Sequence, residues 1–249
     1  MASSKTDKSI IAICIQELTE DGSTMDLGAI KGDGLRFFHQ AFITDTIMNA
    51  LNVPDCDIRL YYIENPERQR LVALITDYLK SKLKGKQAKE FETRFSSHAM
   101  EKERWGLRLD KIFRECFSQG YRKVLLSGSR TPTMTTKMYK TALRMLEQSD
   151  AVFGPTPEGR YYHIGMSGKY NFDLAGFDWK SPKIYSEVAN AFTEKKLSWS
   201  ELEIWYAVES VEELELMARD INQYRFEGDE TTGLETEKVM ERLLSKLEE

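Results

Sequence analysis

The feature that most constrains this chain is a regular alternation of short apolar segments with longer amphipathic ones. Residues 9–15 (SIIAICI) have the composition of a strand buried on both faces. A second strand is expected at residues 56–63 (CDIRLYYI) and a further buried strand at residues 123–127 (KVLLS). A longer segment with apolar residues at helical spacing follows each of them: residues 35–51, 67–84 and 135–148. This alternation predicts an α/β protein, a three-layer sandwich around a mostly parallel mixed sheet.

The remaining elements continue the pattern. Further extended segments are expected at residues 91–96, 151–153, 159–166 and 201–208. Further helices are expected at residues 105–119, 181–195 and 211–225. Thr135 is a plausible N-cap for the helix that follows it, and Gly120 a plausible stop for the helix before it.

A last amphipathic helix is expected over residues 235–248. Thr232 and Glu235 have the spacing of a capping box at its start. Its apolar residues Val239, Leu243 and Leu247 must be buried somewhere, either on the chain's own domain or on a homodimer or protein partner. We therefore divide the chain into a domain at residues 1–226 and an acidic linker with this helix at residues 227–249.

Composition excludes several classes of protein. The chain has 249 residues, of which 41% are hydrophobic and 30% charged, which is typical of an ordinary globular protein that can bury a sizeable core. No apolar run approaches the roughly 20 residues that span a bilayer, and the first residues do not have the pattern of a secretory signal, so we expect a cytoplasmic protein without a membrane span. The three cysteines are well separated, which argues against a disulfide framework or a zinc site.

The net charge of −5 comes from the C-terminal end. Residues 227–249 hold eight acidic and three basic side chains, so the rest of the chain sums to zero. A balanced chain does not have the basic surface of a nucleic-acid-binding protein. Residues 80–111 hold ten basic and five acidic side chains, which we interpret as a solvated surface rather than a patch for an anionic partner.

Candidate chemistry lies in the loops that follow the strands, since open α/β sheets bind ligands beyond the carboxyl ends of their strands. These loops are residues 16–34, 128–133 and 154–160. They contain none of the common phosphate-binding or metalloprotease motifs. His163 lies between apolar residues of an expected strand, where we favour a core or rim role over catalysis.

Residues 123–166 are the most informative stretch. A strand leads into Gly128-Ser129-Arg130-Thr131-Pro132, then come a helix, a strand ending in Gly-Pro, and a strand with Tyr-Tyr and Ile-Gly. This order resembles an uncharacterised bacterial glycosyltransferase-like family related to the nucleotide-diphospho-sugar transferases, whose pattern is GSD-x-P followed by GP-x-x-D-G-G-Y-Y-x-I-G. Residues 177–182 and 207–214 are similar to two later segments of that family. The resemblance covers residues 9–225 and implies a glycosyltransferase-A fold.

The resemblance also implies a ligand and a site. The ligand class is a nucleotide or nucleotide sugar. The implied nucleotide- or sugar-binding residues are Gly128, Ser129, Arg130, Arg160, Tyr161 and Trp179. The candidates for a general base on an acceptor hydroxyl are Glu158, Asp178 and Glu209.

Departures from the family's pattern weaken the implied chemistry. In a metal-dependent sugar transferase an Asp on the loop after the strand holds a divalent cation, and here that position is Arg130. The family's D-G-G has become Glu158-Gly159-Arg160, and the first Asp of its D-x-D-T has become Ala207. Residues 16–30 hold no Lys or Arg where the family carries basic residues, and they carry four acids instead: Glu17, Glu20, Asp21 and Asp26. We therefore expect no cofactor, with Mn²⁺ or Mg²⁺ only if other acids compensate for Arg130.

Two main hypotheses remain open. In one, Arg130 and Arg160 supply fixed positive charge in place of a metal, and the chain is an active metal-independent glycosyltransferase. In the other, which we favour, the fold was kept while metal-dependent catalysis was lost or altered, and the protein has a non-catalytic role in binding or protein interaction. The acidic first loop would then repel a diphosphate. A nucleotidyltransferase on the same fold is a third hypothesis.

Overall fold

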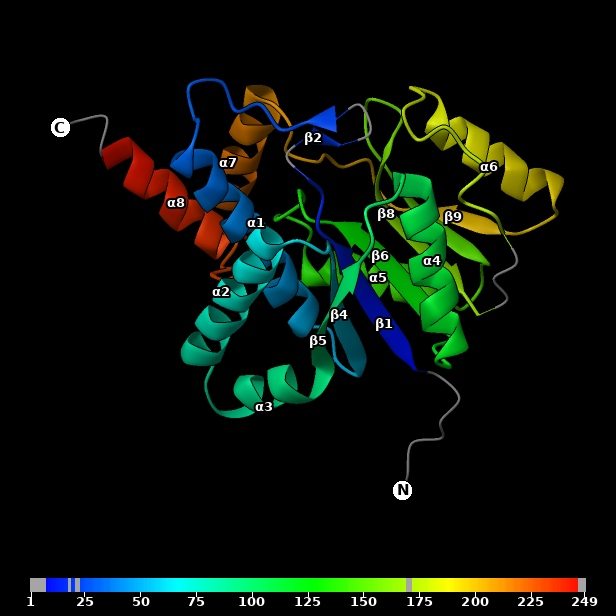
Figure 1. Ribbon diagram of the computed structural model, residues 1–249, viewed down its shortest axis with the longest axis horizontal. Coiled ribbons are helices and arrows are strands. Elements are labelled where there is room, and N and C mark those ends of the chain that lie inside the picture. Colours follow the sequence, from blue (N-terminus) through cyan, green and yellow to red (C-terminus); the bar gives the residue numbers. More distant parts are fainter. Residues whose placement is uncertain (1–7, 18, 21–22, 169–171, 246–249) are drawn as a thin grey trace.

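The computed structural model describes residues 8–17, 19–20, 23–168 and 172–245 (Figure 1). A seven-stranded sheet forms the centre, in the order β5-β4-β1-β6-β8-β7-β9. Its strands are β1 (Ser9–Cys14), β4 (Cys56–Ile63), β5 (Phe95–Met100), β6 (Lys123–Gly128), β7 (Ala151–Pro155), β8 (Tyr161–Ser167) and β9 (Trp199–Glu201). The short strands β2 (Thr19–Glu20) and β3 (Ser23–Thr24) form a separate pair. Strand β8 runs antiparallel to both of its neighbours and the other pairs are parallel, which confirms the predicted α/β fold with a mostly parallel mixed sheet.

Helices cover both faces of this sheet. They are α1 (Asp33–Leu51), α2 (Pro66–Lys82), α3 (Gly85–Arg94), α4 (Trp105–Ser118), α5 (Thr136–Met145), α6 (Ile184–Glu194), α7 (Val211–Phe226) and α8 (Leu234–Ser245). Helices α1, α2, α3 and α5 contribute apolar residues to the core on one face, and α4 and α6 to the core on the other. The layers are therefore helix, sheet and helix.

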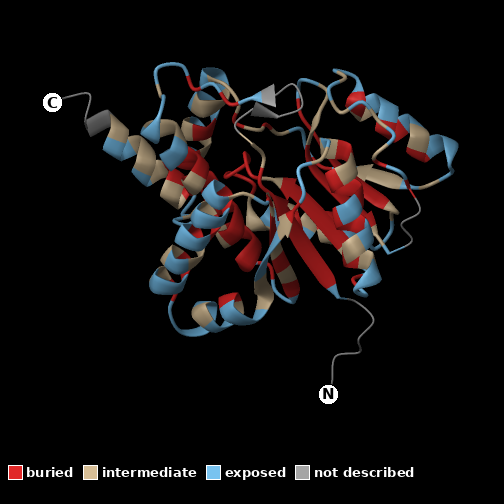
Figure 2. Ribbon diagram, in the orientation of Figure 1, coloured by how far each residue is buried: buried red, intermediate tan, exposed pale blue. Residues whose placement is uncertain are grey.

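Strand β1 shows why the central strands are apolar throughout. Ile11 and Ile13 belong to the core under α1 and α5, whereas Ile10 and Ala12 belong to the core under α4. Successive side chains of a strand point to opposite faces, so a strand with helices on both sides needs apolar residues at every position. Figure 2 shows the central strands buried along their length.

A third apolar cluster joins the segments around one end of the sheet. It contains Met25 and Leu27 from the first loop, Phe38 and Phe42 from α1, and Tyr206, Val208, Met217 and Ile221 from the segment after β9 and from α7. Val239, Met240 and Leu243 of α8 pack against it. This cluster ties the first loop to the C-terminal helices, and Trp205 packs against both it and one of the sheet cores.

The prediction of a strand at residues 91–96 was wrong. Helix α3 continues to Arg94, and strand β5 begins only at Phe95. The Arg94 guanidinium donates to backbone carbonyls of Leu51 (3.1 Å) and Cys56 (2.8 Å), contacts that fix the end of the helix and that no local pattern reveals. Strand β5 itself is an edge strand with exposed polar residues, so it lacks the apolar composition expected of an inner strand.

The extended segment predicted at residues 201–208 is only partly a strand. Strand β9 ends at Glu201, and the residues after it make scattered backbone bonds: Leu202 N–H to Phe153 O, Trp205 N–H to Pro155 O and Val208 N–H to Arg130 O. These bonds run across the end of β7 and reach the loop after β6. They place Glu209 at the edge of the sheet where the parallel strands end.

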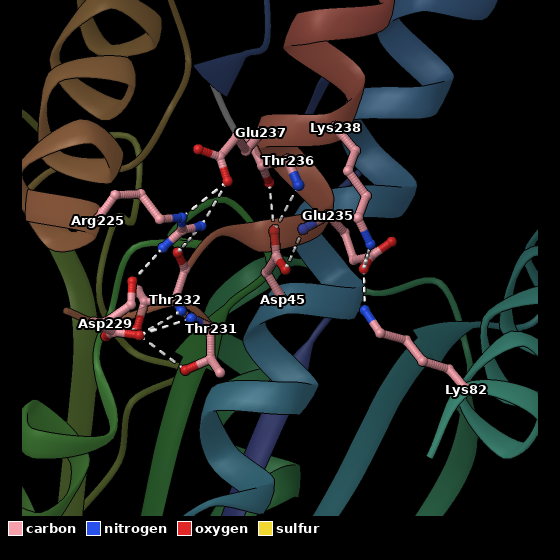
Figure 3. Close-up of polar contacts among 10 residues, drawn as sticks. All are labelled: Asp45, Lys82, Arg225, Asp229, Thr231, Thr232, Glu235, Thr236, Glu237 and Lys238. Atoms are coloured by element: carbon pink, nitrogen blue, oxygen red, sulfur yellow. Dashed lines mark hydrogen bonds and ion pairs between the residues drawn. The ribbon is translucent and has the colours of Figure 1, made fainter. Parts of the chain in front are cut away.

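The predicted capping box of the last helix was also wrong. The Thr232 hydroxyl donates to Asp229 (2.6 Å) rather than capping the helix. Figure 3 shows that the first turn of α8 is capped by Asp45 of α1: its carboxylate accepts from Glu235 N–H (2.9 Å), Thr236 N–H (2.8 Å) and Thr236 Oγ1 (2.7 Å). A cap supplied by another helix cannot be found from local sequence.

Helix α8 packs on its own chain. Its Glu235 carboxylate bonds to Tyr78 Oη (2.6 Å) and Lys238 Nζ (2.8 Å), and it also pairs with Lys82 of α2. Arg225 of α7 pairs with Glu237 (2.8 Å). Leu247 lies outside the described residues, and the division at residue 227 stays a prediction. In the described part of the chain, we find no helix of the length and apolarity that crossing a membrane needs.

We predict that the buried Asp45 makes stability depend on pH. Burial raises the pKa of Asp45 to about 7, although the three donors act in the opposite direction. A group whose pKa is raised on folding stabilises the fold at low pH, and this contribution is lost as the pH rises through about 7. The free energy of unfolding of the natural chain should therefore fall by about 2 kcal/mol between pH 5 and pH 8, relative to the Asp45→Asn variant.

The measurement is urea unfolding of both proteins at several pH values. Asp45→Asn keeps the shape and one acceptor but does not titrate. An identical pH dependence of the two proteins would show that Asp45 does not titrate in this range.

Candidate functional site

A pocket of about 230 Å³ opens at the carboxyl edge of the parallel strands. Gln16 after β1, Gly128 at the end of β6 and Thr156 after β7 lie on its wall, together with Tyr161 at the start of the antiparallel β8. Its opposite wall comes from α4 and from the segment that precedes α7. This is the edge at which open α/β sheets bind ligands, so the pocket is the candidate site.

Arg130 is held inside the protein beside this pocket. Only 1% of its surface is exposed, and its Nη1 donates to Glu209 Oε1 over 2.9 Å. Its Nη2 donates to the backbone carbonyl of Glu17. The backbone of Arg130 also accepts from Val208 N–H (2.7 Å). The ion pair therefore joins the loop after β6 to the loop before α7, two segments that carry motifs of the resemblance.

A second guanidinium neutralises an acid of the first loop. Arg68 of α2 donates to both oxygens of Glu17, from Nε over 3.0 Å and from Nη2 over 2.6 Å. Its Nη1 lies 3.4 Å from His39 Nδ1. Burial, followed by the charges of Arg68 and Arg130, lowers the pKa of His39 to about 3, so this imidazole is neutral. Glu17 is therefore a bound anion rather than one exposed to repel a ligand.

The other acids of the first loop differ in their placement. Asp26 is exposed and pairs with Lys31 over 2.5 Å. Asp21 and the side chain of Glu20 lie outside the described residues. The sequence predicts that these four acids repel a diphosphate. The bonds from Arg68 weaken that repulsion at Glu17. The prediction stays untested at Glu20 and Asp21.

Arg108 of α4 completes this set of buried cations. It is 1% exposed, its Nη2 lies 3.2 Å from Cys14 Sγ, and its guanidinium stacks 4.8 Å from the centre of the Trp105 ring. Trp105 lines the pocket, so Arg108 lies behind the pocket wall. Both Arg68 and Arg108 were missed from the sequence because each lies in an amphipathic helix, where charged residues are expected to face solvent.

Aromatic side chains form the apolar wall of the pocket. Trp179 and Tyr161 have their ring centres 6.0 Å apart, and both line the pocket beside Trp105. The Trp179 Nε1–H donates to Leu174 O over 2.8 Å, which fixes the ring. Gly106 allows this placement, since a Cβ there would overlap the Trp179 indole and lie 2.8 Å from Leu174 O.

The polar rim carries Glu158 and Arg160. The backbone turn that presents them is closed by Thr156 N–H to Arg160 O (2.9 Å) and requires Gly159 at a φ of 73°, where a Cβ would lie 2.6 Å from Pro182 O. Among the described residues, Arg160 makes no ion pair within 4.0 Å. It is therefore the cation that the pocket offers to a ligand.

The structure brings most of the predicted site residues together. Those that line the pocket are Gly128, Glu158, Arg160, Tyr161, Trp179 and Glu209. Ser129 is buried and accepts a bond from Gln16 N–H (3.1 Å), and Arg130 lies behind Glu209. Asp178 lies in a neighbouring depression, where its carboxylate accepts from Lys180 N–H (3.1 Å) and closes a turn. The roles assigned to these residues stay predictions.

His163 belongs to the core. It is 1% exposed, its Nδ1 lies 2.8 Å from Ser127 Oγ, and burial lowers its pKa to about 3. A histidine that stays neutral in this way is a poor general base at neutral pH. Cys14, Cys56 and Cys116 are buried as free thiols.

A side-chain cation occupies the position that corresponds to the related family's metal-holding carboxylate. The family's cation-holding position carries the Arg130 guanidinium, which already pairs with the nearest carboxylate, Glu209. No three His, Cys, Asp or Glu side chains converge as metal ligands in the part of the chain that the structure describes. We therefore derive no step through a metal.

The fold is that of the nucleotide-diphospho-sugar transferases. Residues 63–181 match the model of a family described as an uncharacterised protein conserved in bacteria (DUF2064), which confirms the predicted resemblance. The match covers slightly less than half of the chain. No curated protein matches the chain.

Solved structures share the fold. A protein from Desulfovibrio desulfuricans G20, provisionally described as a nucleotide-diphospho-sugar transferase, is 21% identical with a TM-score of 0.72, covering 95% of this chain and 98% of its own. The 4-diphosphocytidyl-2C-methyl-D-erythritol synthase from Anaerococcus prevotii DSM 20548 is 11% identical with a TM-score of 0.52, covering 89% and 99%. At these identities the likeness establishes the fold alone.

We predict that Gly106→Ala displaces Trp179 from the pocket wall. The added Cβ overlaps the indole and approaches Leu174 O, which no rotamer change relieves. Overpacking of this kind should lower stability by about 2 kcal/mol and change the near-UV circular dichroism of the tryptophans. Gly176→Ala is the matched control, since its Cβ would meet Asp173 Oδ2 at an ordinary 3.4 Å. Equal effects of the two substitutions would contradict the assigned role of Gly106.

Proposed function

We propose that the chain binds a nucleotide or nucleotide sugar in this pocket without a divalent cation, and that it has lost metal-dependent glycosyl transfer. The observation that carries the proposal is the Arg130–Glu209 ion pair. It puts a buried guanidinium where the related family places a cation-holding carboxylate. A metal would have to displace a fixed positive charge from its counter-ion, which Coulomb repulsion opposes.

The shape and polarity of the pocket support a ligand with an apolar face and an anionic part. Trp105, Tyr161 and Trp179 supply flat surfaces on which a ring can stack. Arg160 supplies a partly exposed guanidinium, whose donors fit phosphate oxygens. This combination suits a nucleotide or nucleotide sugar better than a neutral apolar molecule.

A metal-independent transferase is the second candidate. Glu158 and Arg160 project from one turn at the pocket rim, so a carboxylate that can accept a proton lies near a cation that can stabilise a departing diphosphate. A nucleotidyltransferase is supported only by likeness of fold to the Anaerococcus protein.

A protein partner or second copy at helix α8 is a separate hypothesis. Its described apolar residues Val239 and Leu243 pack against the third cluster, so a homodimer through this helix would require an exchange of contacts. Removing residues 234–249 and measuring mass in solution tests that alternative.

We predict that UDP-, GDP- or dTDP-linked sugars raise the melting temperature of the protein equally with and without Mn²⁺. A ligand at about a hundred times its Kd stabilises the native state by about 2.7 kcal/mol. Thermal unfolding with each compound, with Mn²⁺ or with a chelator, is the measurement. A rise that requires Mn²⁺ contradicts metal independence, and no rise with any nucleotide sugar contradicts binding.

We predict that Arg130→Asp introduces a response to Mn²⁺. The new carboxylate faces Glu209, so the variant should lose about 2 kcal/mol of stability and regain part of it when Mn²⁺ is added. Arg130→Asn is the matched control, because it removes the guanidinium without adding charge. An equal effect of Mn²⁺ on the natural chain would show that a cation site already exists.

A further inference from the structure

We propose that Arg68, Arg108 and Arg130 form an anion subsite for a diphosphate group, and that Glu17 and Glu209 occupy this subsite as internal anions. The inference rests on the proposed function, since it names the part of the nucleotide ligand that this subsite receives. Ligand binding then requires the ligand's phosphate oxygens to replace at least one of these carboxylates.

The three guanidiniums converge at the carboxyl end of β1 although they come from different elements. Arg68 contacts the Glu17 side chain, Arg130 contacts the Glu17 backbone, and Arg108 contacts Cys14, the last residue of β1. Each of the three side chains is more than nine-tenths buried: Arg68 is 9% exposed, and Arg108 and Arg130 are each 1% exposed. The convergence lies at the sheet edge where ligands of this class of fold bind.

The contacts within the subsite have the geometry of anion recognition. Arg68 holds Glu17 through two parallel bonds of 3.0 Å and 2.6 Å, one to each carboxylate oxygen. Two parallel N–H donors match a phosphate as well as a carboxylate. Glu17 therefore takes the position that a pair of phosphate oxygens can take.

The electrostatic surroundings favour anions. Burial lowers the pKa of His39 to about 3 and so keeps it neutral, and the charges of Arg68 and Arg130 act in the same direction. Burial raises the pKa of Glu17, but the bonds and charge of Arg68 outweigh it, so the pKa is lowered overall. The charges of Arg68 and Arg130 therefore act on groups at the end of β1 although neither arginine lies in the first loop.

Glu209 separates the subsite from the pocket. Its side chain is 30% exposed and lines the pocket, whereas Arg130 behind it is 1% exposed. The Glu209 backbone is fixed, because its carbonyl accepts from Asp26 N–H over 2.8 Å. Only the side chain needs to rotate for a diphosphate in the pocket to reach Arg130. Exchange of one anion for another leaves the guanidinium paired, which avoids the large cost of a bare buried charge.

Inorganic pyrophosphate tests the subsite directly, because it carries neither sugar nor base. Calorimetric titration at low ionic strength should show at least tenfold tighter binding to Glu209→Gln than to the natural chain. Glu17→Gln should act in the same direction. Adding Arg130→Gln to Glu209→Gln should abolish the gain. Circular dichroism and melting temperature establish that each variant is folded.

Glu215→Gln is the matched control, since it removes one acidic charge from an exposed position on α7. The proposal is overturned if Glu209→Gln and Glu215→Gln gain equal affinity for pyrophosphate. It is also overturned if neither Glu209→Gln nor Glu17→Gln gains affinity. UDP is tested beside pyrophosphate. If the subsite holds the diphosphate of a nucleotide, the affinity for UDP should rise in Glu209→Gln by a similar factor. If the variants bind pyrophosphate more tightly but no nucleotide sugar binds, the subsite is supported and the proposed function is rejected.

Discussion

The Arg130–Glu209 ion pair is the interaction on which the organisation of the site depends. It joins the loop after β6 to the segment that leads into α7, and the backbone bond from Val208 to Arg130 runs beside it. Arg130 also reaches the carbonyl of Glu17, so three loops meet at one guanidinium. A single buried cation thereby links these loops and pairs with one of the carboxylates that line the pocket.

The surrounding helices support this arrangement from outside the pocket. Helix α7 begins directly after Glu209, with a capping box in which Ser210 and Glu213 bond to each other's backbone N–H groups. The third apolar cluster packs α7, α8 and the first loop together. The Asp45 carboxylate anchors the start of α8 to α1. The loops at the pocket therefore rest on packed helices rather than on their own local structure.

Much of the fold could be predicted because apolar periodicity reports burial. Strand β4 matches its predicted bounds, the strand and helix around Gly128 were placed correctly, and Thr135 caps α5 through its bond from Met138 N–H (3.2 Å). The errors occurred where contacts with distant residues determine where an element begins or ends. Helix α3 ends at Arg94, which binds the carbonyls of Leu51 and Cys56, and α8 is capped by Asp45. Neither contact leaves a trace in neighbouring residues.

By itself, the sequence determined the layered α/β architecture, the loops that carry the site and the replacement of a family carboxylate by Arg130, because these follow from local composition and from motifs. Only the tertiary structure decided what that arginine does. Its partner Glu209 lies 79 residues along the chain, and Arg68 and Arg108 come from helices whose charged residues look like ordinary surface. Charges interact through space, so the electrostatics of the site depend on which side chains the fold brings together at the edge of the sheet.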